Sequence, residues 1–209
     1  PGRRIVCRGD LHIRGTRINP VFIRPQRDGD PYTGLEVIGN GSGEVRINGL
    51  QMSGGGAGGA TMVRIQGMER TQVEGTILEG ERGAQLLWVA GGEVALIGCS
   101  ATGGYLSFAQ VQGLLKGVDV RGADRGTGAA GLVVDGARIR MEGGSIVRST
   151  GAALDVRNSA QVLLLNARYE ENGTGLLAID GSLVNVSSCR FTGNGTVFDL
   201  RSVKATRGG

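Results

Sequence analysis

Two short stretches of this 209-residue chain place carboxylates beside arginines, and these residue types are the best suited to chemistry. Carboxylate oxygens are the ligands that Ca²⁺ prefers, and the ion needs several of them on one face. A basic residue within reach can then take part in proton transfer. The first stretch holds Glu79, Glu81 and Arg82, and the second holds Asp119, Arg121, Asp124 and Arg125. Their chemistry depends on whether the fold brings the two stretches together.

The three cysteines and the single histidine do not form a catalytic or metal-binding set. One histidine, His12, without neighbouring His or Cys ligands cannot make an ordinary zinc site. Cys99 and Cys189 occupy the same position of the repeat described below, four units apart. That separation corresponds to roughly 19 Å, beyond the reach of a disulfide. We expect these two cysteines to be small core residues and His12 to lie on the surface.

Composition favours many short strands and excludes several classes of protein. Glycine supplies 40 residues and proline only 4, which suits strands joined by tight turns. The net charge is +4, but the arginines are scattered and stacking aromatics are few, so we expect no nucleic acid partner. No apolar run is long enough to span a membrane. The chain starts without an initiator Met or a signal-peptide core, and we expect it to be a fragment of a longer protein.

A repeat of roughly 19 to 26 residues runs through most of the chain. Asn172-Gly173-Thr174 returns as Asn194-Gly195-Thr196, and short apolar alternations lie between the two copies. A second apolar strand precedes most units, as in Leu154-x-Val156 and Leu177-x-Ile179. The first apolar position of successive units falls at Val45, Thr71, Val94, Gly113, Ile139, Val162 and Val184, and the position two residues later falls at Ile47, Val73, Leu96, Leu115, Met141, Leu164 and Val186.

Repeats of this length, built from short strands and glycine turns, predict a solenoid in which each unit packs against its neighbours. No amphipathic helical segment accompanies the strands, which argues against a leucine-rich repeat. We therefore predict an all-β fold, a parallel β-helix of about nine coils. One domain is expected over residues 1–209, with irregular first coils at 1–43 and regular repeats at 44–203.

The chain resembles the right-handed parallel β-helix repeat proteins of the pectate-lyase-like superfamily. The most specific segments are ALDVRNSAQVLLLNARYEENGT at 153–174 and GLLAIDGSLVNVSSCRFTGNGT at 175–196. The first fifty residues are similar to the first coils of bacterial exported and surface β-helices. This resemblance implies a right-handed coil and a secreted or cell-surface location. It says little about activity, since the same fold carries lyases, hydrolases, adhesins and inert stalks.

The resemblance also implies how a catalytic site would be built. Relatives that cleave acidic polysaccharides hold Ca²⁺ with carboxylates on adjacent coils and use an arginine or lysine as the base. In this chain the intervening coil offers Ser100 and Thr102, which leaves a gap of roughly 10 Å. The compact motifs of the catalytic families are absent, so we assign no catalytic residue and expect no cofactor. If the chain is a lyase, the carboxylates that hold Ca²⁺ and the arginines that act on the substrate would come from one set of residues: Glu79, Glu81, Asp119, Arg121 and Arg125.

Asparagines and aromatic residues have structural explanations. Asn172 and Asn194 stand at equivalent turns, where stacked asparagines can hydrogen-bond from coil to coil. Inward positions are predicted for Tyr169, Phe191 and Phe198. Trp88 is expected in the core, with an exposed sugar-binding platform as the alternative.

From the sequence we expect a non-catalytic scaffold, an adhesin-like or glycan-contacting module of an exported or cell-surface bacterial protein. Its partner would then be a polysaccharide or a cell-surface glycan. The first alternative is a polysaccharide lyase, or a related carbohydrate-active enzyme, that acts on acidic glycans. The second is a module that self-associates through the open ends of the solenoid, because unpaired strand edges invite pairing.

Overall fold

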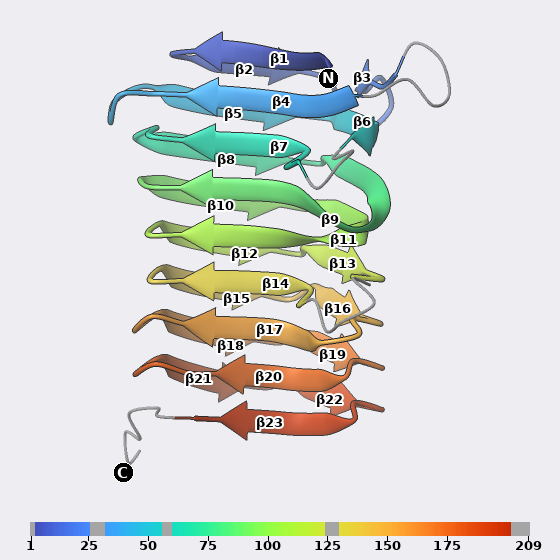
Figure 1. Ribbon diagram of the computed structural model, residues 1–209, viewed down its shortest axis with the longest axis vertical. Helices are drawn as coiled ribbons and strands as arrows, with labels where there is room; N and C mark the ends of the chain where they lie inside the picture. The colour runs from blue at the N-terminus through green and yellow to red at the C-terminus, as the bar shows by residue number, and fades with distance from the viewer. Residues whose placement is uncertain (1–2, 26–31, 56–59, 124–129, 202–209) are drawn as a thin grey trace.

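A computed structural model describes residues 3–25, 32–55, 60–123 and 130–201 of the chain. Within these residues all regular secondary structure is β-strand, and the strands β1 to β23 stack in parallel along one long axis. The N-terminal end lies at one end of the stack and the C-terminal end at the other (Figure 1). The molecule is a right-handed parallel β-helix, as predicted.

The strands fall on three faces. Face 1 carries β1 (Arg3–Arg8), β4 (Tyr32–Ile38), β7 (Val63–Gln66), β14 (Leu132–Asp135), β17 (Ala152–Arg157), β20 (Thr174–Ala178) and β23 (Thr196–Leu200). Face 2 carries β2 (Leu11–Arg14), β5 (Glu44–Asn48), β8 (Arg70–Glu74), β10 (Glu93–Ile97), β12 (Gln112–Lys116), β15 (Arg138–Glu142), β18 (Gln161–Leu165) and β21 (Leu183–Ser187). Face 3 carries β3 (Val21–Ile23), β6 (Leu50–Gly55), β13 (Asp119–Arg121), β16 (Ser145–Val147), β19 (Arg168–Glu170) and β22 (Arg190–Thr192).

Two long strands, β9 (Ile77–Ala90) and β11 (Ser100–Ala109), bend from face 3 into face 1 and join these faces into one 15-stranded sheet. Face 2 is a separate 8-stranded sheet. Its end strands, β2 and β21, have a neighbour on one side only, and about six turns are fully stacked between the two ends. The expected number of about nine coils was therefore too high, because it included the incomplete coils at the ends.

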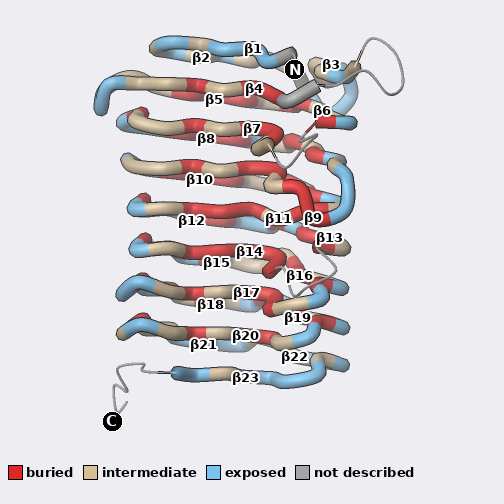
Figure 2. Tube along the Cα trace, viewed as in Figure 1, coloured by how far each residue is buried: buried red, intermediate tan, exposed pale blue. Residues whose placement is uncertain are grey.

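The repeat positions form the columns of the core. All seven first positions, from Val45 to Val184, are register partners on face 2, and so are the seven positions from Ile47 to Val186. Most of these side chains are fully buried, since alternate residues of a strand point to the same side. Figure 2 shows this buried interior running through the middle coils and fading toward the last one. The predicted repeat is confirmed.

Turn glycines allow the coils to approach closely. Gly92 has a φ of 74°, and a Cβ there would lie 2.1 Å from the Met68 carbonyl oxygen of the preceding coil. Gly144, with a φ of 80°, would meet the Val118 carbonyl oxygen at 2.2 Å. A side chain at either position would be strained and would also collide with backbone, so glycine is required there.

Some apolar residues of the chain do not point into the core. Thr16 and Ile18 lie between β2 and β3, outside any strand, and Ile18 is 89% exposed. In β20 the inward residues are Leu176 and Ala178, not Leu177 and Ile179. Neighbouring apolar residues fit either phase of an alternation, so the register with β17 and β23 decides which points inward.

Candidate functional site

The predicted carboxylate surface lies on face 3, and the structure brings only part of it together. Glu79 of β9 pairs with Thr102 of β11, which in turn pairs with Arg121 of β13. Glu79 and Arg121 therefore share one column, but they lie two strands apart, roughly 10 Å. Asp119 precedes Arg121 on the same side of β13, and its Oδ1 accepts a 2.6 Å hydrogen bond from Ser145 Oγ.

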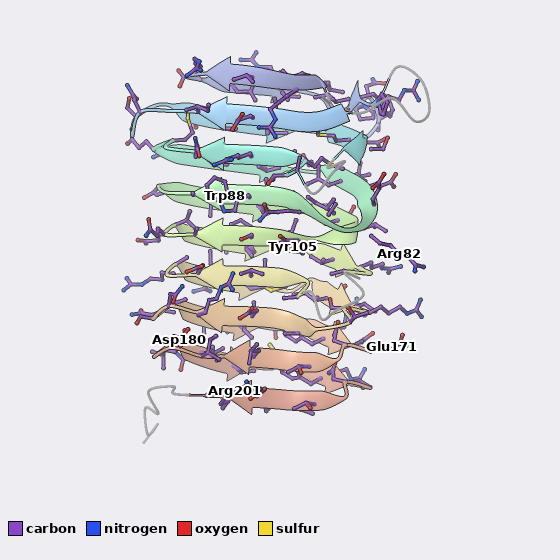
Figure 3. All side chains as sticks on the ribbon, in the orientation of Figure 1. Arg82, Trp88, Tyr105, Glu171, Asp180 and Arg201 are labelled. Carbon is purple, nitrogen blue, oxygen red and sulfur yellow. The ribbon has the colours of Figure 1, made fainter. Side chains whose placement is uncertain are left out.

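The remaining predicted residues do not complete a convergent site. Glu81 is exposed near the bend of β9, and Figure 3 shows Arg82 at the rim of the stack, pointing away from it. Asp124 and Arg125 lie outside the described residues. In the part of the chain that the structure describes, no group of three or more His, Cys, Asp or Glu side chains is arranged to hold a metal ion. A lyase role for these residues stays a prediction.

A more extensive surface lies on face 2, where sequence reasoning assigned no site. Its outward side chains border an open groove of about 730 Å³ that crosses six strands, from β8 to β21. Six strands at their usual spacing correspond to a length of roughly 24 Å. The outward residues that line it are Arg70, Gln72, Glu93, Ala95, Gln112, Leu114, Arg138, Arg140, Glu142, Gln161, Leu163, Leu183 and Asn185.

The floor of the groove is apolar on three of its six strands. Ala95, Leu114 and Leu163 share one outward column and are half-buried, and Arg140 lies between Leu114 and Leu163 in that column. Beneath them, on the inward side, Gly113 stands between Val94 and Ile139 in a column that is otherwise β-branched. A Cβ on Gly113 would lie 2.3 Å from Val94 Cγ1, so the core is filled there by its neighbours. The floor therefore has aliphatic side chains at Ala95, Leu114 and Leu163, interrupted by Arg140.

Charged and amide side chains surround this floor. Arg70 Nε lies 3.8 Å from Glu93 Oε2, and Arg140 forms an ion pair with Glu142. Arg138 forms no ion pair with any described residue. The glutamine amides and Asn185 each present two donors and an acceptor, which match the hydroxyl groups of a sugar. The groove can thus bind a chain that is rich in hydroxyl groups and has some apolar surface.

A second hollow of about 580 Å³ adjoins the groove at the turns between faces 1 and 2. The two hollows share four lining residues, Glu93, Gln112, Arg138 and Gln161. The second hollow also involves the turn residues Gly92, Gln110, Val111, Gly136, Ala137 and Ser159. Its side chains are mainly polar, in contrast to the apolar floor of the groove.

Trp88 does not lie in the core, contrary to the expectation from sequence. A register shift between Tyr105 and Leu106 of β11, opposite β9, leaves Leu86 and Leu87 both buried and turns Trp88 outward on face 1. Its ring is half-buried beneath the Arg64 guanidinium, whose central carbon lies 4.7 Å from the ring centroid. Figure 3 shows Trp88 on this face, away from the groove on face 2.

Cys99 and His12 lie where the sequence predicts, in the core and on the surface, whereas Cys189 is only half-buried at the edge of the core. Cys99 is buried in the core, and its Sγ lies 3.4 Å from the Val73 carbonyl oxygen. Burial raises the pKa of the Cys99 thiol, which disfavours the reactive thiolate. Cys7 and Cys189 are half-buried, all three cysteines are free, and His12 is exposed.

The two asparagines form a ladder, which confirms their structural role. Asn172 Nδ2 donates to Asn194 Oδ1 at 3.0 Å, and the Asn172 Oδ1 accepts from the Ser149 amide at 2.9 Å. Beside this ladder the Tyr169 and Phe191 rings stack at 4.7 Å, and Phe191 meets Phe198 edge-on at 4.9 Å. Tyr169 is fully buried as predicted, whereas Phe198 is 47% exposed because β23 ends the stack.

Comparison with known proteins adds no assignment: no protein family, curated protein or solved structure matches the chain. Among the described residues, no helix is long and apolar enough to cross a membrane.

Proposed function

We propose that the chain is a non-catalytic β-helical module that contacts an extended glycan along the groove on face 2. The observation that carries this proposal is the groove itself, an open surface across six parallel strands with an aliphatic floor and amide and guanidinium side chains around it. Its length suits a polymer more than a compact metabolite. The stacked coils supply a rigid support, because every inner strand is hydrogen-bonded on both sides.

The chemistry of the lining supports binding rather than turnover. Glu93 and Glu142 are the carboxylates that line the groove among the described residues, and each faces an arginine. The predicted lyase residues Glu79, Asp119 and Arg121 lie on face 3, not in this groove. A bound chain on face 2 would therefore lie far from them.

The compartment is part of the proposal and rests on resemblance. Segments 153–174 and 175–196 resemble the pectate-lyase-like β-helices, and the first fifty residues resemble exported and surface β-helices of bacteria. We therefore place this module in a secreted or cell-surface bacterial protein. There it would act as a scaffold or an adhesin-like surface that holds a polysaccharide.

The test is to fill the groove without disturbing the core. Ala95→Arg adds a long side chain to the groove floor, and Thr102→Arg adds the same side chain to an exposed outward position on face 3. Binding to an array of polysaccharides should be lost in Ala95→Arg and kept in Thr102→Arg, with both variants showing native circular dichroism. Equal binding by both variants would contradict the proposal.

The same pair of variants separates the lyase alternative. A lyase on face 3 would release unsaturated products from acidic polysaccharides in the presence of Ca²⁺, and Thr102→Arg would stop it because Thr102 lies between Glu79 and Arg121. Turnover that is abolished by Arg121→Ala would overturn the non-catalytic proposal.

Self-association is a second candidate, and one observation favours it. Among the described residues, all large apolar side chains that are exposed belong to the coils at the two ends: Ile5, Val6, Ile18, Phe22, Val186, Val197, Phe198 and Leu200. These end coils also present unpaired strand edges. Light scattering over a range of protein concentrations tests this candidate, and a monomer at all of them would remove it.

A further inference from the structure

We propose that Arg138, together with the hollow beside it, is a subsite that selects a glycan carrying an anionic substituent, a carboxylate, sulfate or phosphate. This inference rests on the proposed function, and it goes further by assigning the ligand's chemistry and the residue that recognises it. Arg138 carries the first outward side chain of β15, at the boundary between the groove and the second hollow.

Arg138 lies where the groove meets the second hollow. Gln112, Arg138 and Gln161 are register partners on β12, β15 and β18, and all three line both hollows. A chain that lies in the groove can therefore extend a substituent across this row into the second hollow. The guanidinium lies in the middle of the row, with an amide side chain on the strand to either side.

Arg138 also differs from the other arginines of the groove in its ion pairing. Arg70 and Arg140 also line the groove, but each has a carboxylate partner, Glu93 and Glu142 respectively. Arg138 is exposed and has no ion-pair partner among the described residues, so its charge remains for a ligand. A guanidinium binds planar or tetrahedral oxyanions through paired N–H donors, which is the chemistry a carboxylate, sulfate or phosphate requires.

The walls of the second hollow are already hydrogen-bonded, which leaves recognition to side chains. The turn amides of Gln110, Gly136 and Ser159 donate to the carbonyls of the next coil at 3.0, 3.0 and 2.9 Å. They cannot also form an anion-binding nest of backbone N–H groups. The cation that serves this hollow is therefore Arg138, assisted by the amides of Gln112 and Gln161.

The lining favours a sugar polymer over a nucleic acid. Among the described residues, no aromatic side chain on which a base could stack lines either hollow. The aliphatic floor at Leu114 and Leu163 and the neighbouring amides instead match the mixed apolar and hydroxyl surfaces of a sugar ring.

The test compares polymers that share one backbone: dextran, carboxymethyl-dextran and dextran sulfate, measured in 0.15 M salt so that long-range attraction is screened (Debye length about 8 Å). Arg138→Gln removes the charge and introduces an amide, and Arg168→Gln removes another exposed arginine, on face 3. We expect the native chain to bind the charged dextrans more tightly than dextran. Arg138→Gln should lower affinity for them about fivefold to tenfold, whereas Arg168→Gln should change it less than twofold.

The outcomes separate this inference from the proposed function. Equal affinity for neutral and charged dextrans, or equal losses in Arg138→Gln and Arg168→Gln, overturns the anionic subsite and leaves the glycan-binding groove standing. Tighter, Arg138-dependent binding of a single-stranded oligonucleotide than of dextran sulfate overturns the choice of a glycan. Binding of none of the three polymers overturns both proposals.

Discussion

Asn172 and Asn194 connect two successive coils through their side chains, and both the backbone amide and the Nδ2 of Asn172 donate to Asn194 Oδ1, at 2.9 and 3.0 Å. Asn172 also donates to the Ile146 carbonyl at 3.0 Å and accepts from the Ser149 amide. The Asn172 side chain thus forms hydrogen bonds with backbone groups that the turn would otherwise leave buried and unpaired. Only 3% of Asn172 is exposed, so water cannot replace these bonds.

Asn172→Ala should therefore lower the free energy of unfolding by about 2–4 kcal/mol, because it leaves a buried amide and a buried carbonyl without partners. Urea denaturation of the variant measures the loss. Asn185→Ala is the matched control, since Asn185 is exposed on face 2 and makes no side-chain hydrogen bond with the described residues. Losses of similar size in the two variants would contradict the structural role of the ladder.

The ladder and the columns of the core could be predicted because they repeat. The positions from Val45 to Val184 combine period-2 alternation with a regular return, and both signals are visible in one sequence. The phase of Leu86-Leu87-Trp88 could not be predicted. Three large apolar residues in succession fit either register, and the shift opposite Tyr105 and Leu106 decided it.

The groove could not be predicted for a different reason. Gln112, Arg138 and Gln161 are each ordinary surface residues, and they become a row only when their strands stack in register. The inward columns are recognisable in the sequence because their apolar types recur, whereas the outward columns vary from coil to coil. The sequence signal for the groove is the recurrence of polar residues at outward positions with the spacing of the repeat.

Thr71→Val should stabilise the protein by about 1 kcal/mol. Thr71 is 1% exposed in the inward column between Val45 and Val94, and its Oγ1 has no hydrogen-bond partner. Valine keeps the branched shape and removes the unpaired hydroxyl. Thermal and urea unfolding measure the gain. Thr76→Val is the control, since the equally buried Thr76 hydroxyl donates to the Glu74 carbonyl at 3.3 Å and its loss should give no gain.

Cys99 should resist thiol reagents in the folded protein, because its side chain is enclosed in the core and its pKa is raised by burial. Cys7 and Cys189 are half-buried and should react first. Titration with a chromogenic disulfide at neutral pH should count about two fast thiols, and a third after denaturation. Cys99→Ala should keep the fast count unchanged and remove the slow thiol. A fast count that falls in this variant would show that Cys99 is accessible.

Asp155→Asn should stabilise the protein at neutral pH and not in acid. Burial raises the pKa of Asp155 above its usual 3.8, the neighbouring Asp135 and Asp180 carboxylates raise it further, and Arg157 opposes them. On face 1 the Asp155 column runs between Val133 and Leu177, and its Oδ1 has no hydrogen-bond partner. Because the charged form is disfavoured in the folded state, Asp155 destabilises the protein above its raised pKa. This cost fades as the pH falls through the raised value toward 3.8, and it is absent below 3.8.

The gain from Asp155→Asn should reach at most about 1 kcal/mol at pH 7, since the side chain is partly solvated, and should vanish near pH 3. Urea unfolding at several pH values measures it. Glu69→Gln removes one charge from an exposed site without an ion pair among the described residues, and it should change stability by less than about 0.5 kcal/mol at every pH. A gain from Asp155→Asn that is equally large at pH 3 would mean that shape or hydrogen bonding, and not the buried charge, is responsible.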